Sequence, residues 1–324
     1  MRRDRLFAGD QVVVRTPEEI LSTLDTDGTL DGVPFMPEML DWCGKSFRVQ
    51  RRVEKICVEI RPIYSNRRFA GNDVVLLEGP RCDGNAHDGC QRGCRLFWKE
   101  NWLRPAADNE PLQPVSQGNA GLARLRARLK VKADEDRYFC QSTELAKATE
   151  AFPGRKKPWM LRIAFRELRN GDRTWFEMAR LFTRWSWLML RNAASGQAYL
   201  RGPLKQTPVV SLGLQTGELV RVKSRDEIVQ TLAENGRNRG MSITHEMARC
   251  CGKEAQVRVR VNRIIEEKSG KMRELQNTVM LRDVRGDPAV CEECLCSDEM
   301  GDCPRGELMY WREIWLERVT DTGA

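Results

Sequence analysis

Residues 81–103 read RCDGNAHDGCQRGCRLFWKENWL, and the rest of the chain is best understood from this stretch. It holds three cysteines and one of the two histidines of the chain: Cys82, Cys90, Cys94 and His87. Near the C-terminus, residues 291–316 read CEECLCSDEMGDCPRGELMYWREIWL. The blocks WKENWL and WREIWL align with Trp98 on Trp311, and the same offset places Cys90 on Cys303. The chain therefore carries a cysteine-rich segment twice.

A second, ungapped repeat precedes each of these segments. Residues 9–53 align with residues 217–261, and 17 of the 45 positions are identical. Cys43 and Gly44 fall on Cys251 and Gly252 in this alignment. A match of this density without a gap indicates an internal duplication.

Each copy predicts the same order of short elements. The openings GDQVVVR and GELVRVK alternate like strands, and Thr16 or Ser224 then begins a short helix with a glutamate three residues later. Two further strands, the cysteine segment and the aromatic block follow. We therefore predict an α+β protein in which two duplicated small β-barrels of SH3-like type carry cysteine-rich loops.

The predicted domains are residues 1–107, the first cysteine-rich module, residues 108–208, a linker and helical central segment, and residues 209–324, the second module. Residues 121–130 predict a short basic helix, and residues 159–192 predict two helices that break at Asn170-Gly171-Asp172. The second of these helices is rich in aromatic residues. We expect it to be a buried packing helix rather than a surface that stacks on a ligand.

The aromatic blocks close the two modules. Trp98 and Trp102 are four residues apart, as are Trp311 and Trp315, so on a helix each pair would share a face. We expect each pair to seal a core, since Leu103 and Leu316 follow them. The alternative is that the tryptophans stack on a ring of a ligand.

Composition limits the class of protein. The chain has 324 residues, 41% hydrophobic and 31% charged, with a net charge of +8. This composition is typical of globular domains, and the charge permits a nucleic-acid partner without requiring one. The sequence shows neither a signal peptide nor an apolar run long enough to span a bilayer, so we expect a cytoplasmic protein with no membrane association.

Twelve cysteines in a reducing compartment indicate metal ligands or reactive thiols rather than disulfides. The first module offers Cys43, Cys82, Cys90 and Cys94, and the second offers Cys251, Cys291, Cys294 and Cys303. Four thiolates suit zinc or an iron–sulfur cluster, and three leave one metal position open. We predict about one site per module and favour iron–sulfur slightly, because the first module has no Cys-x-x-Cys pair. The alternative is that these cysteines simply pack in the core.

Several residues keep more than one interpretation. Cys140 has no counterpart in the repeat and could be a ligand, a nucleophile or neither, while Cys57 aligns with Ile265. His87 could be a ligand or an exposed loop residue. Which of Cys291, Cys294 and Cys296 serves as a ligand stays open. Two histidines give little support to a hydrolase of the Ser-His-Asp type, and no phosphate-binding glycine motif occurs.

The motifs together resemble an uncharacterised bacterial family that is met in polysaccharide and secondary-metabolite biosynthetic gene clusters. The resemblance rests on these segments: DGVPFMPEM at 31–39 followed by CG at 43–44, RCDG at 81–84, the cysteines at 90 and 94, FWKENWL at 97–103, CQSTEL at 140–145, CPR at 303–305 and YWREIWL at 310–316. It covers nearly the whole chain. It implies a context of small-molecule or glycan biosynthesis and no established activity.

These observations lead to one main hypothesis and two alternatives. The main hypothesis is a cysteine-ligated metalloprotein that acts in a tailoring or accessory step of natural-product or glycan biosynthesis, with biosynthetic enzymes as partners. The first alternative is a zinc-stabilised protein that binds nucleic acid, and the second is a non-catalytic scaffold for a biosynthetic enzyme. The sequence names neither a substrate nor a catalytic residue, so whether the chain is an enzyme stays open.

Overall fold

The structure is a computed structural model that describes residues 5–60, 63–106, 119–152, 156–195, 200–283 and 304–319. The chain divides into two compact units. Unit 1 comprises Met1–Arg180 together with Ile265–Arg273 and Cys303–Arg305, and unit 2 comprises the remaining segments. The predicted domain boundaries at residues 107 and 208 stay a prediction.

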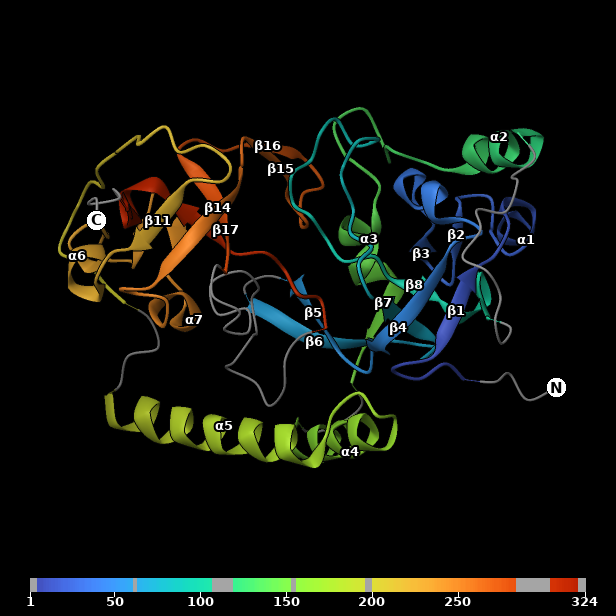
Figure 1. Cartoon of the computed structure of the whole chain (residues 1–324), viewed down its shortest axis with the longest axis horizontal. Helices are drawn as coiled ribbons and strands as arrows, with labels where there is room; N and C mark the ends of the chain where they lie inside the picture. Colours follow the sequence, from blue (N-terminus) through green and yellow to red (C-terminus); the bar gives the residue numbers. More distant parts are fainter. Residues whose placement is uncertain are drawn as a thin grey trace, which may run out of the picture. The chain divides into compact units, whose positions relative to one another are not determined.

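An antiparallel five-stranded sheet forms the centre of unit 1, in the order β8-β7-β4-β1-β9 (Figure 1). Its strands are β1 (Gln11–Val14), β4 (Ser46–Arg52), β7 (Val74–Leu77), β8 (Trp98–Lys99) and β9 (Leu103–Pro105). A three-stranded sheet has the order β10 (Thr149–Ala151), β6 (Ile63–Phe69) and β5 (Ile56–Ile60). The strands β2 (Thr29–Leu30) and β3 (Val33–Pro34) form a short antiparallel pair.

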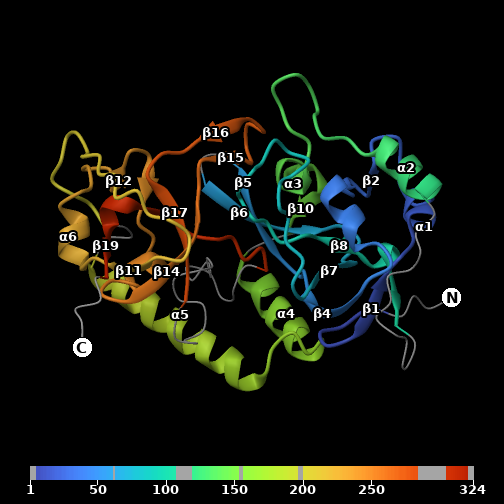
Figure 2. The ribbon, with the colours of Figure 1, turned by 45° about the horizontal axis from the view of Figure 1, so that its top comes forward.

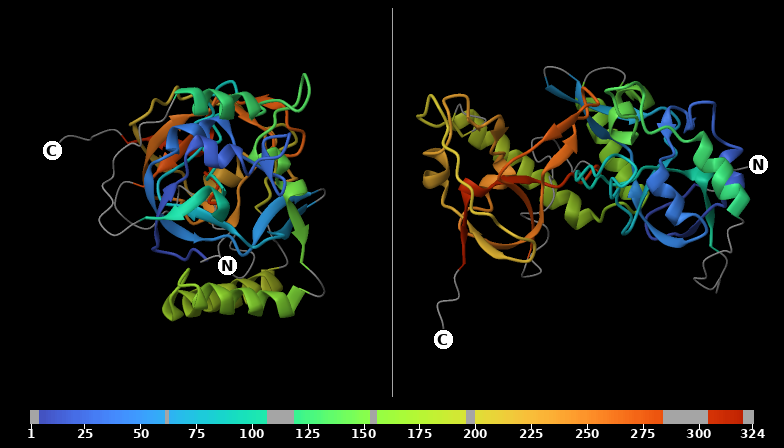
Figure 3. Two further views of the ribbon diagram at one scale, coloured as in Figure 1. Left: turned by 90° about the vertical axis from the view of Figure 1, so that its right-hand side faces the viewer. Right: turned by 90° about the horizontal axis from the view of Figure 1, so that it is seen from above.

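The helices of unit 1 are mostly short. They are α1 (Pro17–Leu21), α2 (Asn119–Arg128), α3 (Gln141–Ala148) and α4 (Lys156–Arg169), with the 3-10 turns η1 (Pro37–Trp42) and η2 (Glu100–Trp102). Helix α2 packs against α1 (Figure 3). The predicted cap of α1 is confirmed: Thr16 Oγ1 accepts from the Glu19 amide at 3.3 Å, and the Glu19 carboxylate accepts from the Thr16 amide at 2.9 Å.

Unit 2 contains a second five-stranded sheet of the same type, in the order β18-β17-β14-β11-β19 (Figure 2). Its strands are β11 (Leu219–Val222), β14 (Glu254–Arg260), β17 (Thr278–Arg282), β18 (Tyr310–Arg312) and β19 (Leu316–Arg318). Unit 2 also contains α6 (Arg225–Val229), α7 (His245–Ala248), η3 (Glu313–Trp315), β12 (Arg237–Asn238) and β13 (Met241–Ser242). The paired strands β15 (Arg263–Ile265) and β16 (Met272–Glu274) lie at the two ends of the segment Ile265–Arg273, which belongs to unit 1.

The two five-stranded sheets correspond strand by strand. The pairing of β4 with β7 shifts register between Val49 and Arg51, and that of β14 with β17 shifts between Val257 and Val259, which are the aligned positions. Both sheets are open, however, so the small closed barrels that we predicted are not confirmed. An open sheet leaves its edge strands β8 and β9, or β18 and β19, unpaired with each other.

The four tryptophans of the aromatic blocks are fully buried, so the prediction that they seal a core is confirmed. Neither pair lies on one helix, so the helical spacing considered above does not apply. Trp98 lies on strand β8, and Trp102 ends the turn η2. The Trp102 indole donates to Thr23 Oγ1 at 3.1 Å, and Trp315 donates to Thr231 Oγ1 at 3.0 Å, so the two copies anchor this ring alike.

The central segment forms two helices, as predicted, namely α4 and α5 (Trp175–Ser195). The expectation that the second is a buried packing helix is wrong for the side chains that the structure describes. Trp175 and Phe176 are 75% and 78% exposed, and Phe182 and Trp187 are also exposed. No helix among the described residues is long and apolar enough to cross a membrane.

Candidate functional site

The cysteine loop, residues 81–95, closes on itself through backbone contacts. Arg81 and Arg95 form an antiparallel bridge, and the Cys82 amide donates to the Cys94 carbonyl at 2.8 Å. Gly84 has φ +69°, and a Cβ there would lie 2.0 Å from the Cys90 carbonyl oxygen. The fold of the loop therefore requires glycine at position 84, both for its left-handed backbone and for this close approach.

His87 is buried inside this loop rather than exposed. Its Nδ1 lies 2.5 Å from Oε1 of Glu38, a buried residue of η1, and its Nε2 lies 3.1 Å from the Phe139 carbonyl oxygen. Burial lowers the pKa of His87, but the hydrogen bond and charge of Glu38 more than offset this effect, so the pKa is raised. Both ring nitrogens already have a partner, and the arrangement favours a buried imidazolium–carboxylate pair.

Four cysteines come together around this pair. Burial raises the pKa of the Cys82 thiol, and the negative charges of Glu38 and Cys94 raise it further. Cys140 precedes α3, and burial raises its pKa, with a smaller contribution from Cys90, although hydrogen bonds from Thr143 and Ser142 oppose the shift. Backbone contacts place the four residues. The Cys82 amide donates to the Cys94 carbonyl, and the Cys90 amide donates to the His87 carbonyl at 3.1 Å. Cys140 follows Phe139, whose carbonyl contacts His87.

Cys90 has a contact that the sequence did not reveal. Its Sγ accepts a hydrogen bond from the Ile265 amide at 3.3 Å, and Cys90, Tyr138 and Ile265 form a small buried cluster. Ile265 belongs to the segment Ile265–Arg273, which the fold places in unit 1 with the loop. The Tyr138 amide also donates to the Gly270 carbonyl at 2.8 Å, which holds this segment beside the loop.

A buried ionic cluster next to α3 was also missed. The Glu267 carboxylate accepts from Arg92 at 3.2 Å, from the Glu59 amide at 3.1 Å and from Arg305. Arg305 also donates to Ser142 Oγ at 3.0 Å. One signal existed: the offset of the aromatic blocks aligns Arg92 with Arg305, and the ungapped repeat aligns Glu59 with Glu267.

The remaining predicted ligands lie elsewhere or outside the described residues. Cys43 is buried at the end of η1, its Sγ lies 4.0 Å from the Met39 carbonyl oxygen, and burial raises its pKa to about 12, with smaller effects from the charges of Asp41 and Glu18. Cys251 packs at the edge of the core of unit 2. The structure does not describe Cys291, Cys294, Cys296 or Cys303.

The described part of the chain contains no group of three or more His, Cys, Asp or Glu side chains that is already placed to hold a metal ion. The cysteine loop thus brings thiols close without converging three of them on one point.

Comparisons with known proteins give no relative. No family model matches the chain, and no curated protein or solved structure is significantly similar to it. The resemblance to a family of biosynthetic gene clusters therefore stays a prediction.

Proposed function

We propose that this protein is a cysteine-ligated metalloprotein whose first site is the cysteine loop. The thiolates of Cys82, Cys90, Cys94 and Cys140 would hold an iron–sulfur cluster, which we favour slightly, or zinc. The observation that carries the proposal is that backbone contacts bring these four cysteines, from the loop and from the residue before α3, into one region around His87.

The hydrogen bond from the Ile265 amide to Cys90 Sγ gives further support. Amide donors to sulfur are a usual means of tuning metal-bound thiolates and their reduction potentials. The proposed set adds Cys140 to the residues that the sequence predicted. It leaves out Cys43, whose sulfur lies beside Met39 and feels the charges of Asp41 and Glu18.

The second copy stays part of the proposal. Cys251, Cys291, Cys294 and Cys303 would provide its site, so that the chain holds about one site per module. We also propose that the two similar sheets are duplicated copies of one SH3-like module. The role would be a tailoring or accessory step in natural-product or glycan biosynthesis, with a biosynthetic enzyme as partner.

The test is metal and acid-labile sulfide analysis of the full chain after purification without oxygen. We expect bound metal in the wild type and a loss of metal in Cys90→Ser and Cys140→Ser. Cys57→Ser is the matched control, because Cys57 is outside the proposed ligand set. A folded wild-type chain without metal contradicts the proposal, and equal metal content in all three variants contradicts the ligand assignment.

One observation favours the nucleic-acid alternative. Helix α5 exposes Trp175, Phe176 and Trp187, and its sequence also contains Arg180, Arg184 and Arg191. Exposed aromatic rings beside arginines can stack on unpaired bases while the cations contact phosphates. Binding of a fluorescent single-stranded oligonucleotide that weakens steeply with salt, and that Phe176→Ser reduces, would support this role. The absence of such binding in low salt would exclude it.

A further inference from the structure

Cys82 and Cys94 occupy directly opposite positions on paired backbone. The antiparallel bridge joins Arg81 to Arg95, so the next pair along the two strands is Cys82 and Cys94. The hydrogen bond from the Cys82 amide to the Cys94 carbonyl at 2.8 Å fixes this register. Directly opposite residues point their side chains to the same face of an antiparallel pair.

This register has the dimensions of a disulfide. Opposite Cα atoms on antiparallel strands are about 4.5–5.5 Å apart, within the range of roughly 4.4–6.8 Å that disulfides span. Both residues are thiols in the structure.

The side chains of Cys82 and Cys94 are more accessible to solvent than those of the other cysteines of the site. Cys82 and Cys94 are only partly buried, whereas Cys90 and Cys140 are buried. Thiol–disulfide exchange requires access to the attacking sulfur, and this pair meets that condition.

We propose that Cys82 and Cys94 form a reversible disulfide, with a low-molecular-weight disulfide of the glutathione type as the oxidant. One cysteine, as its thiolate, attacks the oxidant and forms a mixed disulfide while one glutathione thiol leaves. The other cysteine then displaces the second glutathione thiol. Two cysteine thiols are oxidised, one glutathione disulfide is reduced to two thiols, and the two cysteine protons end on those thiols.

The bond has a consequence that rests on the proposed function. A disulfide removes two of the four proposed thiolate ligands, so oxidation would release metal from the cysteine loop and reduction would restore the site. The oxidation state of one cross-strand pair would then control metal occupancy. Disulfide formation itself does not depend on whether the loop binds metal.

The chain offers a direct way to detect the bond. Trypsin cleaves after Arg81, Arg92 and Arg95, so Cys82 falls in the peptide 82–92 and Cys94 in the peptide 93–95. The full chain, kept without oxygen and treated with chelator, is equilibrated in glutathione buffers of increasing oxidation. Remaining thiols are then blocked, and linked peptides are identified by mass spectrometry.

We expect the peptides 82–92 and 93–95 to become linked, with the loss of two thiols per chain, and dithiothreitol to reverse the link. Cys90→Ser is the matched control, because Cys90 shares a peptide with Cys82 and should not be needed. Cys82→Ser and Cys94→Ser should each abolish the link. A link that persists in Cys82→Ser, or disappears in Cys90→Ser, overturns the assignment, as does a wild type that never forms it.

The two proposals fail in different ways. A chain that forms this disulfide but never binds metal supports the redox pair and contradicts the metalloprotein. A chain that binds metal but forms no link between residues 82 and 94 leaves the metalloprotein intact and contradicts the redox pair.

Discussion

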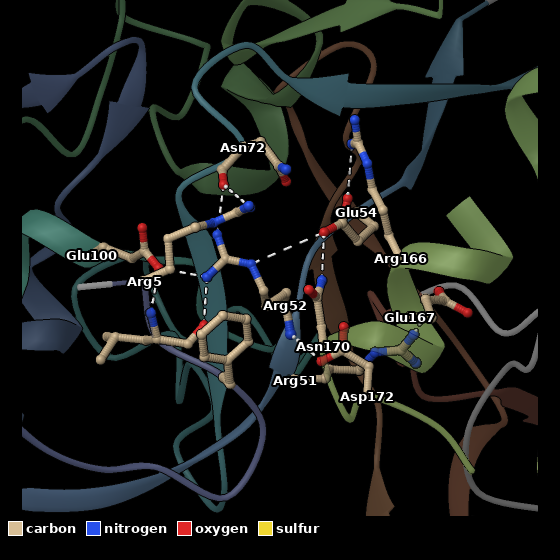
Figure 4. A network of polar contacts seen from close by, with 12 residues as sticks. Arg5, Arg51, Arg52, Glu54, Asn72, Glu100, Arg166, Glu167, Asn170 and Asp172 are labelled. Carbon is tan, nitrogen blue, oxygen red and sulfur yellow. Dashed lines mark hydrogen bonds and ion pairs between the residues drawn. The ribbon is translucent and has the colours of Figure 1, made fainter. Parts of the chain in front are cut away.

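Arg52 and its counterpart in the second copy, Arg260, occupy aligned positions but differ in burial and in hydrogen-bond partners. In unit 1 the Arg52 guanidinium is fully buried and donates to the Leu6 carbonyl at 2.5 Å, to Glu100 at 2.5 Å and to the Asn72 carbonyl at 2.6 Å (Figure 4). Its counterpart Arg260 binds Glu313 at 2.5 Å, but the Arg260 side chain is 30% exposed. After loss of Arg260, the buried Glu313 keeps the backbone amides of Leu212, Gly213 and Leu214 as donors. After loss of Arg52, the Glu100 carboxylate keeps the Leu6 amide, but the Leu6 and Asn72 carbonyls lose the donor that Arg52 supplied. An incompletely compensated buried group is costly.

We therefore predict that Arg52→Met destabilises the protein by about 3–5 kcal/mol, the range for breaking a buried ion pair from one side. Arg260→Met, the matched variant in the second copy, should cost clearly less. Urea unfolding followed by circular dichroism and fluorescence measures both. Equal losses would show that the remaining amide donors of Glu313 do not reduce the cost.

Asp172, whose carboxylate accepts from the Arg52 amide, should make the stability of the folded state depend on pH. Burial raises its pKa from 3.8 to about 6, with smaller contributions from the charges of Glu167 and Glu54, although its Oδ1 accepts from the Arg52 amide at 2.8 Å. The folded state thus favours the protonated acid. The stability that Asp172 contributes is present below about pH 4 and is lost as the pH rises through about 6.

Asp172→Asn keeps an oxygen for the Arg52 amide and removes the charge. We expect its stability relative to the wild type to rise between pH 4 and pH 6 and to stay higher at neutral pH. Thermal melts across this range measure the difference. Asp136→Asn, an exposed site, is the control, and a wild type and Asp172→Asn with parallel pH profiles would contradict the prediction.

At the scale of elements, each short turn connects the two edge strands of its own sheet. Turn η2 connects β8 to β9, and η3 connects β18 to β19. Each ends in a fully buried tryptophan, and the Trp102 ring contacts Phe35 edge-on with centroids 5.2 Å apart. Helix α5 is the opposite case, because its Trp175 faces solvent. The same residue type is therefore core in one element and surface in the other.

We predict that Trp102→Ala costs about 3–5 kcal/mol, as for other large core truncations. It should also lower metal retention if the cysteine loop holds metal, because folding and binding are coupled. Trp175→Ala should change stability by less than about 0.5 kcal/mol. Denaturant unfolding of both variants is the measurement, and a Trp102→Ala protein as stable as the wild type would exclude the core role of this ring.

At the scale of the whole chain, residues of the second repeat complete unit 1. Ile265–Arg273 and Arg305 lie in the same unit as the cysteine loop, and the Glu267 carboxylate joins Arg92 to Arg305. Arg92 and Arg305 are aligned positions of the repeat. Equivalent residues of the two copies thus meet on one carboxylate.

We predict that Glu267→Ala destabilises unit 1 by about 3–5 kcal/mol, because it removes the buried carboxylate that Arg92 and Arg305 share. Hydrogen exchange should become faster in residues 82–94 and in α3. The strands β11 and β14 of unit 2 should change little. Glu317→Ala removes an exposed partner of Arg221 and should have almost no effect. Uniform loss of protection in both units would contradict this assignment.

The sequence alone determined the features that depend on neighbours along the chain or on repetition. The cap formed by Thr16 and Glu19, the break between α4 and α5, and the matching order of strands could be predicted, since hydrogen bonds and turns over a few residues set them. Burial of the tryptophan pairs could also be predicted, because a ring that closes an apolar block gains most from leaving water.

Only the tertiary structure decided which distant groups meet. Glu38 lies 49 residues from its partner His87, and Ile265 lies 175 residues from Cys90, so no local pattern could pair them. The open sheets and the exposed face of α5 likewise depend on where the chain ends each strand and what covers each helix. Periodicity records which residues can be buried, whereas long-range packing selects the partners that bury them.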